Sequence, residues 1–192
     1  MTNRLVAAVA AVLLLTACGS GDDPTVTADA SQSAGSGASV DAAHNDADIA
    51  FVNGMTPHHE GAVEMSELAA TRAASEEVKA LAQRIADAQQ PEIDLMAAMA
   101  QAWGVDVEPE GAHGGGHSTA MPDDAAALEP LSGADFDREF LTRMIEHHKG
   151  ALVMAKAQLA DGENPQAKEL AQAIVTAQEA EIAEMERLLA QL

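Results

Sequence analysis

Two stretches of the sequence nearly repeat each other: GMTPHHEGAVEM at residues 54–65 and RMIEHHKGALVM at residues 143–154. Each carries two adjacent histidines, then Gly-Ala, then a methionine. The whole chain of 192 residues has only seven histidines and nine methionines. An arrangement this uncommon, found twice at a distance of 89 residues (143 − 54), indicates a duplicated unit.

The duplication extends well beyond the two stretches. Residues 48–96 and 137–185 align without a gap, and 18 of the 49 positions are identical. Six of the nine methionines fall into three matched pairs, which are Met55 with Met144, Met65 with Met154, and Met96 with Met185. The chain therefore contains a tandem repeat.

Each copy is predicted to fold as two helices, because Ala, Leu, Met, Glu and Gln dominate and strand-like alternation is absent. The predicted helices span residues 45–72, 75–103, 132–160 and 165 to the C-terminus. Ser132 with Asp135 predicts a capping pair, and Asn164 predicts a cap before Pro165.

Two prolines, Pro57 and Pro91, fall inside the predicted helices of the first copy. They predict either kinks or helix restarts, and the ungapped repeat favours kinks. Residues 104–131 are rich in Gly, Pro and acidic residues and show no periodicity. Two hairpins joined by one long crossover predict an all-α, ferritin-like four-helix bundle, with repeat A at 45–103, a linker at 104–131 and repeat B at 132–192.

The histidines fall on the predicted inner face of this bundle. Steps of four and three residues define a core stripe on the first helix of each copy. The stripe consists of Phe51, Met55, His58, Ala62 and Met65, and of Phe140, Met144, His147, Ala151 and Met154. The facing helices contribute Ile85, Gln89, Glu92 and Met96, and Ile174, Gln178, Glu181 and Met185. Gly61 and Gly150 follow the histidines and indicate close packing or room for a ligand.

This inner face predicts a metal site. Buried His, Gln and Glu at matched positions are costly unless they satisfy each other or a ligand. Thioether sulfur suits Cu(I), and imidazole suits copper and zinc. The predicted ligands are Met55, His58, His59, Met65, Met96, Met144, His147, His148, Met154 and Met185, with Gln89, Glu92, Gln178 and Glu181 supporting them. The pattern does not distinguish one shared central site from two separate, equivalent sites.

Other interpretations compete with this one. Methionines at heptad spacing are common core residues, so a structural or partner-binding protein without metal is one alternative. A metal-dependent redox enzyme is another. A di-iron carboxylate centre is disfavoured, because Met55 and Met144 stand three residues before His58 and His147, where that centre needs glutamate. In the linker, His113 and His117 are candidate accessory ligands, although incidental loop histidines are the simpler interpretation.

The N-terminus predicts export and a lipid anchor. Residues 1–17 have a cationic start and an apolar run, and they end in Leu-Thr-Ala before Cys18. This ending resembles the bacterial lipobox, whose cysteine is lipidated, so we expect membrane attachment through Cys18 and no thiolate metal site. Residues 18–44 then read as a disordered tether. The formal net charge of −21 repels nucleic acid and concentrates cations.

The doubled motif also resembles a known family. FVNGMTPHHEGAVEMSELA and FDREFLTRMIEHHKGALVMAKAQL, each followed by a Q-x-x-E-I-x-x-M helix, are similar to a bacterial domain-of-unknown-function family of small exported proteins. The resemblance covers residues 45–192 and implies ferritin-like topology. A relative in that family is a periplasmic copper-binding protein of cyanobacteria, which implies copper binding by the Met and His residues here.

We therefore predict a membrane-anchored lipoprotein, facing outside the cytoplasm, that binds copper for tolerance, buffering or delivery. Cu(I) is the favoured ion, and zinc and iron are less favoured. The sequence shows no nucleophile paired with a general base and no cofactor motif that would predict catalysis. It does not identify a protein partner.

Overall fold

The structure is a computed structural model that describes residues 39–107 and 124–192. Its helices are α1 (Asp46–Arg72), α2 (Glu76–Trp103), α3 (Asp124–Leu128), α4 (Gly133–Asp161) and α5 (Pro165–Leu189). None of the helices in these two ranges combines the length and the apolar character that a membrane crossing needs.

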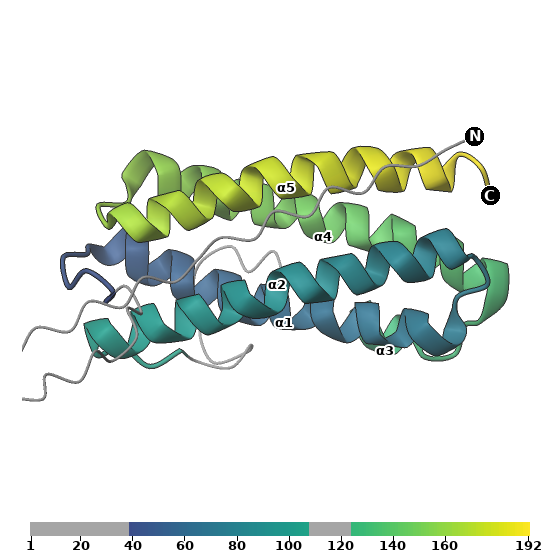
Figure 1. The fold of residues 1–192 in the computed structure, drawn as a ribbon, viewed down its shortest axis with the longest axis horizontal. Coiled ribbons are helices and arrows are strands. Elements are labelled where there is room, and N and C mark those ends of the chain that lie inside the picture. The colour runs from purple at the N-terminus through teal and green to yellow at the C-terminus, as the bar shows by residue number, and fades with distance from the viewer. Residues whose placement is uncertain (1–38, 108–123) are drawn as a thin grey trace, which may run out of the picture. The chain divides into compact units, whose positions relative to one another are not determined.

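The four long helices form the predicted bundle. α1 packs along α2 and α4 packs along α5, so each copy of the repeat is a helical hairpin. The two hairpins meet mainly through α1 and α4, and Figure 1 shows the long helices running alongside one another. The prediction of an all-α four-helix bundle made of two duplicated hairpins is confirmed.

Local sequence explains most of the helix starts. The Asn45 side chain accepts hydrogen bonds from the backbone at the start of α1, while Asp48 accepts one from Asn45 N at 2.8 Å, which completes a capping box. Asn164 caps α5 as predicted. The capping pair predicted at Ser132 is wrong, because its side chain makes no capping hydrogen bond and Gly133 turns the chain with φ 68° instead.

The prolines do not interrupt the helices of the first copy. α1 continues through Pro57 and α2 continues through Pro91. The alternative in which the helices restart at these positions is therefore wrong. Because proline has no backbone N–H, each removes one helical hydrogen bond from its own turn.

The interior is divided into two apolar clusters, and each takes residues from both copies. The Met55 cluster comprises Phe51, Val52, Met55, Met96, Met99, Ala100, Ala151, Ala155, Ala167, Leu170, Ala171, Ile174 and Val175. The Met144 cluster includes Phe136, Phe140, Met144, Met185, Ala62, Met65, Leu81, Ile85 and Leu128. Most residues of one cluster have their repeat counterpart, 89 positions away, in the other cluster; Phe51 and Phe140 are an example. The two halves of the bundle are thus built alike.

Candidate metal centre

Polar side chains separate the two clusters at the middle of every long helix. On α1 the Met55 cluster reaches Met55 and the Met144 cluster begins at Ala62, with the two histidines between them. The order is the same on α5, whereas on α2 and α4 the Met144 cluster comes first along the chain. We call this set the central polar layer: His58 and His59 from α1, Gln89 and Glu92 from α2, His147 and His148 from α4, and Gln178 and Glu181 from α5.

His58 and His147 meet at the centre of this layer. Their ring centroids lie 3.7 Å apart with an interplanar angle of 40°, and both side chains are buried. Burial lowers the pKa of His58 to about 3, with a further contribution from the charges of His59 and His148. Burial also lowers the pKa of His147 to about 2, assisted by His58 and the two neighbouring histidines. Both rings are therefore neutral at pH 7.

The other two histidines are held by carboxylates from the facing helices. His59 Nε2 lies 2.8 Å from Glu92 Oε2, and His148 Nε2 lies 2.8 Å from Glu181 Oε2. Because an ionised carboxylate can only accept, each Nε2–H donates, and Nδ1 of a neutral ring then carries a lone pair. These two pairs are related by the repeat, since both members are shifted by 89 residues.

Many polar atoms of the layer have no hydrogen-bond partner among the residues that the structure describes. They are both ring nitrogens of His58, Nδ1 of His59, His147 and His148, both amide atoms of Gln89, and Oε1 of Gln178. A buried polar atom without a partner costs free energy, and several such atoms gathered at one level of a bundle point to a ligand.

The methionines flank the polar layer in two sets. Met55 and Met96 belong to the Met55 cluster, and Met154 packs against it. Met144, Met185 and Met65 belong to the Met144 cluster. Each set therefore combines two methionines of one copy with one methionine of the other. This arrangement was not predictable from the stripe alone, because it depends on how α1 and α4 pack.

Carboxylates and histidines alone do not assemble a metal site in the described part of the chain. Within residues 39–107 and 124–192, no three side chains of His, Cys, Asp or Glu form a group that could hold a metal ion. A metal in the central polar layer would therefore need methionine sulfur or another donor besides the histidines. Gly61 lies beside the central pair, but a Cβ at Gly61 would lie 3.6 Å from His147 Nε2, an ordinary van der Waals contact, so close packing alone does not require glycine there.

Several predicted residues lie outside this centre. Cys18, His113 and His117 fall outside the residues that the structure describes. His44 stacks on Trp103, with ring centroids 4.8 Å apart. The residues just before α1, which the sequence assigns to the tether, hydrogen-bond to the start of α5 through Asp41 and Asn164.

Sequence reasoning missed two buried aspartates that tie the copies together. Asp48 on α1 accepts hydrogen bonds from Glu163 N and Asn164 N, in the turn between α4 and α5. Asp137 on α4 accepts hydrogen bonds from Ala74 N and Ser75 N, in the turn between α1 and α2. The signal was present, because Asp48 and Asp137 are identical positions of the repeat.

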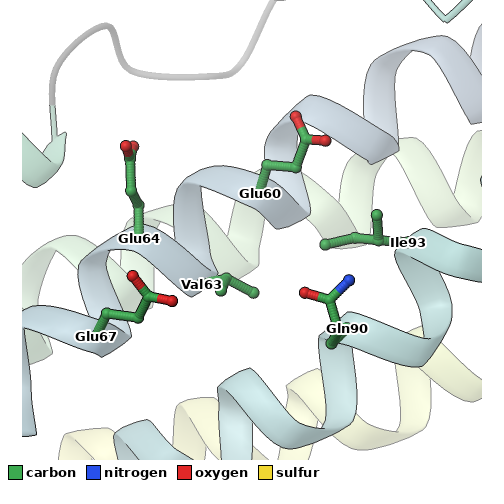
Figure 2. A pocket seen from close by; sticks show the side chains of 6 residues that line it. All are labelled: Glu60, Val63, Glu64, Glu67, Gln90 and Ile93. Atoms are coloured by element: carbon green, nitrogen blue, oxygen red, sulfur yellow. The ribbon is translucent and has the colours of Figure 1, made fainter.

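A separate hollow lies between α1 and α2. It has a volume of about 200 Å³ and is lined by Glu60, Val63, Glu64, Glu67, Gln90 and Ile93. Figure 2 shows the three glutamates of α1 around it. In the second copy, Lys149, Val153 and Lys156 take the places of these glutamates, so the acidic hollow is not duplicated.

Comparisons with known proteins agree with this fold. CopM in the Cu(II)-bound form is 36% identical, with a TM-score of 0.65 over 75% of this chain and 96% of that chain. A putative secreted DUF305 protein from Streptomyces coelicolor is 32% identical, with a TM-score of 0.65 over 76% of this chain and 93% of that chain. A DUF305 fragment from Deinococcus radiodurans is 29% identical, with a TM-score of 0.66 over 77% of this chain and 98% of that chain. A comparison with curated proteins found no match.

CopM is also known in a Cu(I)-bound form, which is 34% identical to this chain with a TM-score of 0.64. The model of the family described as "Domain of unknown function (DUF305)" matches residues 48–189, which is most of the chain. Its match includes both histidine motifs and nearly the whole length of the four long helices. The chain belongs to the DUF305 family.

Proposed function

We propose that this protein binds copper, with Cu(I) as the favoured ion, in the central polar layer and between the flanking methionines. The supporting observation is the set of buried histidine nitrogens that lack partners among the described residues. A bound cation would satisfy these lone pairs and remove the cost of burying them. Because the layer and its methionines are duplicated, each half of the bundle offers the same kinds of donor.

The donor chemistry favours copper over harder ions. The layer supplies imidazole nitrogen and the clusters supply thioether sulfur, a combination that selects Cu(I). Glu92 and Glu181 hold His59 and His148 through Nε2 at 2.8 Å, as carboxylates do for many histidine ligands. The low pKa values of His58 and His147 keep these rings neutral and able to bind without first losing a proton.

The relatives support the same assignment. CopM, whose fold this chain shares, has been crystallised with Cu(II) and with Cu(I). It has also been crystallised with silver, which like Cu(I) is a soft ion that favours sulfur. We infer that this protein holds copper outside the cytoplasm for tolerance, buffering or delivery, after export by residues 1–17 and lipid attachment at Cys18. The relative from Streptomyces coelicolor, which is described as a putative secreted protein, supports export.

The proposal is tested by an anaerobic Cu(I) titration against a chromophoric chelator. The paired variant Met55→Leu with Met144→Leu keeps the core volume while removing one sulfur from each half. We expect its Cu(I) affinity to fall by at least about tenfold, because leucine offers no donor. Met99→Leu is the matched control, since Met99 is equally buried but has leucine, Leu188, as its counterpart in the repeat.

A second variant isolates the nitrogen donors. His58→Gln with His147→Gln should also weaken Cu(I) binding, because the central pair loses its ring nitrogens. If the wild-type protein fails to compete with the chelator, copper binding is refuted and a structural or partner-binding role takes its place. Unchanged affinity in the methionine variant would remove Met55 and Met144 from the proposed ligands while leaving the histidines among them.

A further inference from the structure

The two methionine sets differ in their access to solvent. Seven methionines lie in the described residues, and six of them are fully buried. The exception is Met154, which is partly exposed, whereas Met65, its counterpart in the repeat, is fully buried. The two halves of the bundle offer the same kinds of donor atom, but they differ in solvent exposure at the position of Met65 and Met154.

A glycine lies against the sulfur of Met154. The nearest neighbour of Gly54 outside its own backbone is Met154 Sδ, and a Cβ added at Gly54 would lie 3.2 Å from that sulfur. Such a contact is tighter than most Cβ atoms make, so a side chain at residue 54 would require the Met154 sulfur to shift by a few tenths of an ångström. The sulfur of Met154 thus lies against bare backbone of α1, one residue before the fully buried Met55.

The second copy closes the same position with an arginine. Arg143 stands where the first copy has Gly54, and its side chain binds Asp124 through Nη1 at 2.6 Å and Glu139 through Nε at 2.7 Å. Asp124 begins α3, and Leu128 at the end of α3 is fully buried in the Met144 cluster together with Met65. In this half, α3 therefore packs against the cluster that contains Met65 and is held by Arg143, whereas the equivalent position in the other half is Gly54.

We propose that copper enters and leaves this protein through Met154, beside Gly54, and that the Met144 cluster holds the closed, slowly exchanging half. This inference rests on the proposed copper binding. A partly exposed thioether can take a soft ion from a donor in solution and pass it inward to Met55 and His58 without unfolding the bundle. In the other half, exchange requires α3 to move away from Arg143.

The access of the two sulfurs is measurable without metal. We expect hydrogen peroxide to oxidise Met154 of the full-length, metal-free protein at least about tenfold faster than Met65, because oxidation of methionine follows exposure. Peptide mass spectrometry gives the rate at each methionine separately. Equal rates at Met154 and Met65 would overturn the difference in access on which the proposal depends.

The route itself is tested by the kinetics of copper removal. When the copper-loaded, full-length protein is mixed with excess chelator, we expect a fast and a slow phase. Met154→Leu should slow the fast phase at least about tenfold by removing the exposed sulfur. The control Met99→Leu replaces a fully buried methionine that is not a proposed ligand, and it should leave the fast phase unchanged. A single phase, or a fast phase whose rate is unchanged in Met154→Leu, would overturn the proposed route while leaving copper binding intact. If the protein does not bind Cu(I) at all, the proposed function fails and the route fails with it.

Discussion

Burial of His58 and His147 should make stability depend on pH in a defined window. An unfolded histidine has a pKa of about 6.5, whereas in the fold the pKa values are about 3 and about 2. Between these limits the unfolded chain binds more protons, so the free energy of unfolding is highest above pH 6.5 and falls as pH drops toward 3. Each histidine contributes a slope of up to about 1.4 kcal/mol per pH unit.

Urea unfolding of the metal-free protein at several pH values between about 7 and 4 measures this slope. His58→Gln with His147→Gln serves as the control, because glutamine does not titrate and the pH dependence should flatten. If both proteins lose stability equally with acidification, the two histidines are not the groups responsible.

The turns of the two hairpins depend on the facing copy. Burial alone would raise the pKa of Asp48, but hydrogen bonds from Gln158, Asn45, Glu163 and Asn164 outweigh it and lower that pKa. Asp137 makes the corresponding contacts with Ala74 N and Ser75 N at 3.0 and 2.9 Å. Each hairpin therefore fixes the turn of the other, which links helix pairing to the assembly of the whole bundle.

Removing either charge should weaken the bundle. We expect Asp48→Asn and Asp137→Asn each to lower the free energy of unfolding by about 1–3 kcal/mol, because the buried backbone N–H groups lose a charged acceptor. Asp48→Asn should cost more, since Asp48 serves more donors. Chemical denaturation near neutral pH measures both, and the exposed Asp135→Asn on α4 should change little. Equal stability of all three variants would contradict this role.

Among the structural elements, the sequence predicted the features that follow from residue spacing, but not those that depend on how the helices pack. The heptad steps and the ungapped repeat were enough to predict four long helices and inward histidines, because helical period follows from residue order alone. α3 is only five residues long and had no periodic signal. The Met154 sulfur beside Gly54 joins residues 100 positions apart (154 − 54), so only the packing of α1 against α4 reveals it.

For the whole molecule, the net charge opposes the proposed lipid attachment. With 31 acidic residues against 10 basic ones, the protein is repelled by anionic lipid headgroups. The lipid proposed at Cys18, the only cysteine, would have to outweigh this repulsion. The same acidity raises the local concentration of cations, which would assist the proposed binding of copper.

Cys18→Ser should therefore release the protein from the membrane. Serine cannot carry the thioether-linked lipid, so we expect the variant in the soluble fraction after cell fractionation, while the unaltered protein sediments with membranes and dissolves in detergent. Met154→Leu should stay with the membrane, because it leaves the N-terminus intact. The released variant should keep its Cu(I) affinity, since every proposed ligand lies in the helices beyond residue 45. Membrane attachment that survives Cys18→Ser would refute the lipid anchor and require another contact with the membrane.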